Sequence, residues 1–179
     1  MTRLVLLLAL LGCAGLPAVP DAPPDPRVRP GALFGGATCG AGVLTHADGT
    51  TPRPFTVESR GAPAGEGLIL DQTIRFDDGE VRERRWTLQP DGARTYRGTL
   101  TEASGDVRAQ VGGNRLTLSY PLAGVPLGRM TQVLTLRADG GVDNVGTARV
   151  VGVPVRRLRE EIARAGEEGC PPPHTNTLP

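Results

Sequence analysis

Residues 68–89 read LILDQTIRFDDGEVRERRWTLQ, and this stretch contains the pattern that decides the fold. In its first run, apolar residues recur at every second position apart from Gln72 and would share one face of an extended chain: Leu68, Leu70, Ile74 and Phe76. Asp78-Gly79 is a hairpin turn signal, and a second extended run follows over Val81–Gln89. The stretch therefore predicts two antiparallel strands joined by a tight turn.

The same alternation and the same kind of turn signal recur along the chain. Leu116, Leu118 and Tyr120 alternate with polar residues. Further turn signals are Asp48-Gly49, Asp91-Gly92, Gly112-Gly113 and Asp139–Gly141. Further strand candidates are Gly42–His46, Arg53–Arg60, Thr95–Thr101, Val107–Val111, Met130–Arg137 and Val142–Val150. About eight or nine short strands with hairpin connections predict an all-β domain, either a small lipocalin-like up-and-down barrel or a strongly curled sheet.

The segment after Gly152 departs from this pattern. Pro154 suits the first turn of a helix, and four apolar residues follow at helical spacing: Val155, Leu158, Ile162 and Ala165. Gly166 suits a helix end. We therefore expect a short amphipathic helix over 153–166 that caps one end of the barrel.

The N-terminus indicates export. Arg3 precedes an apolar run over Leu4–Leu11 that is far shorter than the roughly 20 residues needed to cross a bilayer. The run leads into Gly12-Cys13, a pair typical of the site where bacteria acylate a cysteine and cleave just before it. The alternative is an ordinary secretory signal with an incidental cysteine. Acylation would anchor the chain to the envelope, and Ala14 after Cys13 favours the outer membrane, with the domain facing the periplasm.

The chain has three cysteines, an odd number for an oxidising compartment. If Cys13 carries the lipid, Cys39 and Cys170 remain and are predicted to form a disulfide. The alternative leaves both as free thiols.

These signals divide the chain into five parts. We expect a signal peptide over 1–12, a lipidated cysteine and Pro-rich tether over 13–30, the barrel over 31–152, the helix over 153–166 and a disordered Pro-rich tail over 167–179.

Composition argues against several classes of function. The net charge of +1 from interspersed charges provides no basic face for nucleic acid. The two histidines, His46 and His174, lie far apart and lack the spacing of a metal site. No nucleophile motif or phosphate loop occurs, so we expect neither an enzyme nor a cofactor.

Two polar residues are predicted to face the barrel interior. Alternation places Gln72 with Leu70 and Ile74, and it places Arg84 with Trp86. Because an unpaired buried charge is costly, these side chains either bind a ligand headgroup or form a private polar network. If a ligand is bound, Tyr96 and Tyr120 are expected to lie near it.

Several short motifs in a fixed order resemble a known bacterial family. They are Phe76–Glu80, Arg84–Trp86, Tyr96–Gly98, Gly113-Asn114 and Tyr120–Leu122. Together they resemble the family called domain of unknown function 3833, over roughly Leu33 to Val155. The resemblance implies a small lipoprotein and names no activity.

Two functions stay open at this point. The first is a structural or interaction lipoprotein whose barrel is filled by its own side chains and whose surface contacts another envelope protein. The second is a lipocalin-like binding module for a small apolar or amphipathic ligand. Strand number does not decide between them, whereas the large inward residues favour a filled barrel.

Overall fold

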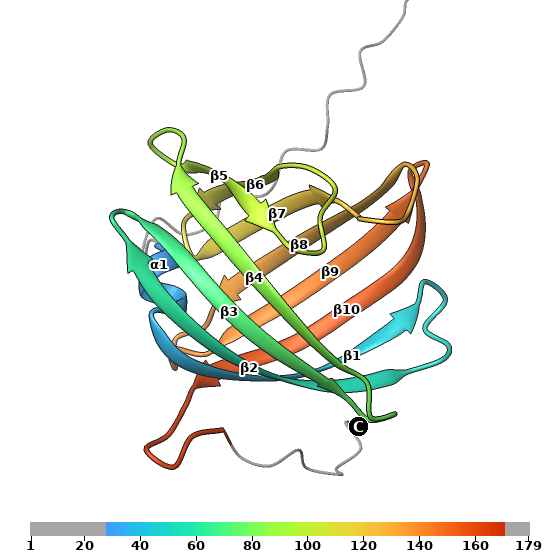
Figure 1. Ribbon diagram of the computed structural model, residues 1–179, viewed down its shortest axis with the longest axis horizontal. Helices are drawn as coiled ribbons and strands as arrows, with labels where there is room; N and C mark the ends of the chain where they lie inside the picture. Colours follow the sequence, from blue (N-terminus) through green and yellow to red (C-terminus); the bar gives the residue numbers. More distant parts are fainter. Residues whose placement is uncertain (1–27, 171–179) are drawn as a thin grey trace, which may run out of the picture.

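The computed structural model describes residues 28–170, which form one closed barrel of ten antiparallel strands (Figure 1). The predicted barrel architecture is confirmed, although the predicted number of strands, eight or nine, is lower than the ten observed. The strands are β1 (Gly36–His46), β2 (Arg53–Ala64), β3 (Gly67–Phe76), β4 (Val81–Pro90), β5 (Thr95–Leu100), β6 (Val107–Gly112), β7 (Arg115–Pro121), β8 (Gly128–Leu136), β9 (Val142–Val150) and β10 (Val153–Arg164).

The strands form a meander in which each pairs with the next along the chain, and β1 pairs with β10 to close the barrel. Alternation sets which side chains face inward. In β7, for example, Leu116, Leu118 and Tyr120 are buried while their neighbours are more exposed. Closure leaves no unpaired sheet edge. Within the described residues, no helix is long and apolar enough to cross a membrane.

The two ends of the barrel differ. A short helix, α1 (Pro30–Phe34), lies at one end, which we call the helix end, and the β1–β2, β3–β4 and β9–β10 turns lie at the other, the open end (Figure 1). Phe34 is buried in the larger core cluster. Gly61 of β2 permits this packing, because a Cβ there would clash with the Phe34 carbonyl oxygen. A cap exists, but it precedes the first strand: Pro30 is the last residue of the predicted tether, and residues 31–34 belong to the segment predicted as barrel.

The predicted helix over 153–166 is wrong, because most of this segment is β10. Its burial alternates, with Leu158, Glu160 and Ile162 buried and the residues between them exposed. The helical spacing of the apolar residues was real, but β10 supplies the backbone hydrogen bonds that both β1 and β9 need. Tertiary pairing therefore overrides the local pattern. A register shift between Pro154 and Arg156 accommodates the proline.

Other predicted boundaries also change. The first strand begins at Gly36 rather than Gly42, and it contains Cys39 instead of following it. Residues 167–170, predicted as part of a disordered tail, form a turn held at Cys170. The predictions for 1–12, for 13–27 including Cys13, and for 171–179 lie outside the described residues.

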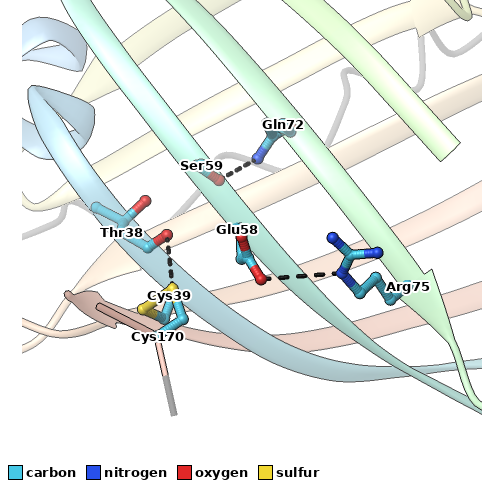
Figure 2. Close-up of a disulfide and its surroundings, with 7 residues drawn as sticks. All are labelled: Thr38, Cys39, Glu58, Ser59, Gln72, Arg75 and Cys170. Atoms are coloured by element: carbon cyan, nitrogen blue, oxygen red, sulfur yellow. Dashed lines mark hydrogen bonds and ion pairs between the residues drawn. A yellow bond between two sulfur atoms is a disulfide. The ribbon is translucent and has the colours of Figure 1, made fainter. Parts of the chain in front are cut away.

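The predicted disulfide between Cys39 and Cys170 is present, with its Cα atoms 5.4 Å apart (Figure 2). Cys39 lies opposite Ala163 in the β1–β10 register. The Cys170 Sγ also lies 3.7 Å from the Thr38 carbonyl oxygen. The bridge therefore fastens the chain after β10 to β1, across the seam that closes the barrel.

Candidate functional site

Within the described residues, the buried polar side chains of the barrel interior are Thr38 of β1, whose Oγ1 has no hydrogen-bond partner, and two groups on other strands. The first group, the Gln72 wall, consists of Ser59 of β2, Gln72 of β3 and Arg84 of β4, which are neighbours in the strand register. The second group, the Glu160 wall, consists of Gln132 of β8, Asn144 of β9 and Glu160 of β10. All but Arg84 are fully buried.

Hydrogen bonds connect the Gln72 wall completely. The Gln72 side-chain amide donates from Nε2 to Ser59 Oγ at 2.9 Å (Figure 2). Its Oε1 accepts from Arg84 Nε at 2.8 Å and from the Trp86 indole at 2.7 Å. Gln72 of β3 thus bonds three side chains on the two neighbouring strands, as expected for a stabilising polar network.

The guanidinium of Arg84 has further partners. Its side chain is 12% exposed, and a terminal nitrogen lies 3.5 Å from the Glu102 carboxylate. The guanidinium carbon lies 5.4 Å from the centre of the Trp86 ring, within cation–π range. Trp86 in turn meets Tyr120 edge-on at 5.4 Å. Burial raises the pKa of the Tyr120 phenol to about 12.

The Glu160 wall is less complete. Asn144 Nδ2 donates to Glu160 Oε2 at 2.8 Å. Within the described range, Glu160 has no cation within 4.0 Å, and burial raises the pKa of its carboxyl above the ordinary value. The charge of Arg84 and the bond from Asn144 offset this effect only in part. Gly40 of β1 leaves space for the carboxylate, because a Cβ there would clash with Glu160 Oε1.

A small cavity separates the two walls. It measures about 30 Å³ and is lined by Gln72 and Arg84, by the Glu160 wall and by apolar side chains that include Phe34. Two lining residues have buried atoms without a hydrogen-bond partner, Gln132 Nε2 and Asn144 Oδ1. A water needs roughly 10 to 15 Å³ and two or more polar partners, so the cavity suits one or two waters.

A larger groove lies outside the barrel, at the helix end. It measures about 450 Å³ and runs beside α1, the β8–β9 turn and the end of β10. Two of its arginines are engaged, since Arg137 pairs with Asp143 and Arg164 donates to the carbonyl oxygen of Ala32. Among residues 28–170, no three His, Cys, Asp or Glu side chains could together hold a metal ion.

The predicted ligand residues are divided among these features. Gln72, Arg84 and Trp86 line the cavity together, as alternation predicts. Tyr120 contacts Trp86 but does not line the cavity, and Tyr96 is half-buried at the edge of the larger core cluster. Whether any of them binds a ligand stays a prediction.

Sequence reasoning missed the whole Glu160 wall, although a signal was present. Gln132 lies between Met130 and Leu134 on the buried side of its strand, so the alternation marks it as inward. Glu160 lies in the same way between Leu158 and Ile162. The helix prediction hid this second alternation, because on a helix those three residues do not share one face.

The fold and the sequence together define a small closed barrel of unassigned activity. The chain belongs to the family described as "Protein of unknown function (DUF3833)", which matches residues 7–137. No curated protein matches the chain.

Two solved structures have a similar fold. One is the S-type phycobiliprotein lyase CPES from Guillardia theta, with a TM-score of 0.61 and 7% identity, covering 76% of this chain and 90% of the lyase. The other is a protein of unknown function from the DUF3598 family of Nostoc punctiforme, with a TM-score of 0.57 and 15% identity, covering 78% of this chain and 50% of that protein. At these identities the likeness shows the fold alone.

Proposed function

We propose that this chain is a lipid-anchored barrel of the bacterial envelope that acts through its outer surface, with an interior filled by its own side chains. The observation that carries the proposal is the size of the internal cavity. About 30 Å³ holds one or two waters, whereas sites for small molecules usually measure 300 to 1,000 Å³. The paired polar groups of the Gln72 wall support the same conclusion.

The anchor is proposed from the cysteines. Cys39 and Cys170 pair with each other, so Cys13 is the third cysteine and the one available for acylation. A disulfide is favoured in an oxidising compartment such as the periplasm. The family match begins inside the apolar run and includes Gly12-Cys13. With Ala14 following, we place the protein at the outer membrane, facing the periplasm.

Intact-mass analysis of protein extracted from host membranes tests the anchor. We expect a polypeptide that begins at Cys13 and carries at least two acyl groups, because a single acyl group binds membranes only marginally. Replacement of Cys13 by Ser should release the protein from the membrane fraction. An unmodified N-terminus, or a wild-type protein found entirely in the soluble periplasm, would contradict the proposal.

A second function has one specific observation in its favour. Gln132 Nε2 and Asn144 Oδ1 face the cavity without partners, beside the buried Glu160. A donor, an acceptor and a carboxylate around one cavity suit the polar head of a small amphipathic ligand. The interior of the barrel would have to widen to admit such a ligand.

Native mass spectrometry of protein from its own host separates the two functions. A filled barrel should show no adduct beyond the acyl groups. A co-purifying mass in the hundreds of daltons would favour the binding module, and replacement of Arg84 by Leu should then abolish retention while the fold persists. With no ligand, the same replacement should mainly lower the melting temperature.

A further inference from the structure

Exposed apolar side chains gather at the open end of the barrel. Leu127, in the β7–β8 connection, is 78% exposed, and Val151, in the β9–β10 turn, is 71% exposed. The two connections touch, since the Val151 amide donates to the Leu127 carbonyl oxygen at 3.4 Å. Val125, in the β7–β8 connection, and Val153, the first residue of β10, are also exposed. We call these four residues the apolar tips.

The backbone at two of these tips is unusual. Leu127 has a φ of 56° and Val151 a φ of 50°, in the left-handed region that bulky L-residues rarely adopt. For a β-branched residue such as Val151 this conformation is a genuine outlier and costs free energy. Neither side chain recovers that cost by packing inside the protein, because both are exposed. The fold thus holds two large apolar groups in solvent.

Arginines surround the tips. Arg129 of β8 lies directly opposite Arg149 of β9, an arrangement of like charges that destabilises a sheet. Arg156 and Arg157 follow on β10, and all four are exposed. Among residues 28–170, none of the four has an acidic side chain within 4.0 Å.

Two acidic connections flank the tips, the β5–β6 connection and the β1–β2 turn. In the β1–β2 turn, Asp48 bonds Thr50 and follows Ala47, whose amide donates to the Val155 carbonyl oxygen of β10. The β5–β6 connection lies beside the β7–β8 connection, through the bridge between Ala103 and Leu122. Its two carboxylates have other partners: Glu102 lies 3.5 Å from Arg84, and Asp106 lies 3.5 Å from Arg97. The surface around the tips therefore carries unpaired positive charge.

We propose that the open end docks on an anionic lipid surface, with the apolar tips inserted among the acyl chains and the surrounding arginines at the phosphate level. Protruding apolar groups beside basic residues are the chemistry that binds the interface of an anionic bilayer. A second copy of the same surface would be repelled by its arginines. This inference deepens the proposed action through the outer surface and does not depend on acylation of Cys13.

The length of the N-terminal segment is compatible with such docking. The described chain begins at Val28, whose amide bonds to the turn at Gly113 at the helix end. Cys13 lies 15 residues earlier, a reach of up to about 50 Å when extended. A nine-residue strand such as β8 spans roughly 30 Å. An anchored chain could therefore place its open end on the same membrane or on a facing one.

A fluorescent probe at one tip tests the proposal. Val151→Cys in the full chain is labelled with an environment-sensitive dye and mixed with phosphatidylcholine vesicles that contain or lack phosphatidylglycerol. We expect a blue shift and brightening with the anionic vesicles only, reversed by about 1 M salt because salt screens the charges. Ala138→Cys, on the β8–β9 turn at the helix end, is the matched control and should not respond. Parent protein without the Val151→Cys replacement, treated with the same dye, controls for reaction at the native cysteines.

Charge variants provide the second measurement. Arg149→Gln and Arg156→Gln should each weaken vesicle binding by about fivefold, and Arg108→Gln, on the outer face of β6, should have a much smaller effect. Unchanged melting temperatures would show that the barrel persists. No response at position 151, or an equal response at 138, overturns the inference. A response without vesicles that grows with protein concentration also overturns it, in favour of self-association. Because the probe reports insertion with or without an acyl group, a soluble wild-type protein would refute the anchor and leave this test valid.

Discussion

The two polar walls of the barrel interior differ in how completely their buried polar atoms are hydrogen-bonded. In the Gln72 wall, the single amide of Gln72 bonds Ser59, Arg84 and Trp86, and no side-chain atom of that amide is left over. Such a network contributes to stability and fixes the register of three strands. Polar residues inside a barrel are thus compatible with a filled core when each one has a partner.

The Glu160 wall retains buried polar atoms without a hydrogen-bond partner. Asn144 bonds Glu160 through one atom and leaves its other atom unpaired, and Gln132 has an unpaired donor. The wall tolerates this because the adjoining cavity has room for water. It also lies next to the β1–β10 seam, which pairs the first strand of the barrel with the last. The contrast indicates that the Gln72 wall stabilises the barrel, whereas the Glu160 wall depends on the neighbouring cavity and on the β1–β10 seam.

The largest expected effect comes from the disulfide, which fastens the seam beside the Glu160 wall. Replacing Cys39 and Cys170 together by Ser should lower the free energy of unfolding by up to about 4–5 kcal/mol, because the cysteines are 131 residues apart and the bridge restricts the unfolded chain. Urea unfolding measures the loss. Reduced wild type should match the double variant.

Hydrogen exchange extends that test to the comparison of the walls. Without the bridge, amides of β10 should lose more protection than those of β3, because local opening begins where fewer constraints remain. Equal loss in both strands would mean that the two walls open as one unit, and an unchanged urea midpoint would remove the stabilising role of the bridge altogether.

The second effect comes from Gln72. Replacing it by Met keeps its length and removes both polar atoms, which leaves Arg84 and Trp86 without their buried acceptor. We expect a loss of about 3 kcal/mol, since an unsatisfied buried donor costs about 1–3 kcal/mol and a charged one more. Urea unfolding measures it, with Thr73→Val on the outer face of β3 as the control. A loss below about 1 kcal/mol would show that water replaces the amide.

The third effect has the opposite sign and depends on pH. Burial raises the pKa of Glu160 in the folded chain, so the native state holds a proton that the unfolded state releases near the ordinary value of 4.5. The free energy of unfolding should therefore fall as the pH rises from about 4.5 to the raised pKa of folded Glu160, and it should stay lower above that pKa. Each unit of pKa shift corresponds to about 1.4 kcal/mol.

Glu160→Gln should consequently be more stable than wild type at pH 7, and the difference should vanish near pH 4. Surface carboxylates change stability in the other direction, for example Asp71, whose pKa is lowered by its bond to Arg85. Comparing melting temperatures of the two proteins across pH isolates the contribution of Glu160. A variant that is less stable than wild type at pH 7 would mean that the charged carboxylate is satisfied in the barrel.

The sequence predicts one wall and not the other for a physical reason. Gln72 interrupts a long, regular alternation of large apolar residues, so its inward orientation follows directly. In β10, apolar residues also recur at helical spacing. Glu160 lies between Leu158 and Ile162, where an apolar residue would have completed the alternation typical of a strand. Only the pairing of β10 with both β1 and β9 resolves this ambiguity, and that pairing is a property of barrel closure rather than of the segment.

Other features depend even less on local sequence. The positive φ of Leu127 and Val151 has no local signature, because neither residue is of a type that favours it. The helix α1 was hidden by Pro30, which suits a tether as well as a first helical turn. The disulfide, in contrast, followed from counting cysteines, since pairing needs no knowledge of the path between them.

The smallest expected effect is the sharpest comparison of the two walls. Gln132→Met makes the same chemical change as Gln72→Met, but it removes a donor that has no protein partner. If a water satisfies Gln132, the free energy of unfolding should change by less than about 1 kcal/mol, because the lost water bond and the gained apolar packing nearly cancel. Urea unfolding of both variants in parallel makes the comparison. A loss as large as that of Gln72→Met would mean that Gln132 belongs to an equally tight network. A loss of co-purified ligand with stability preserved would instead assign the Glu160 wall to binding.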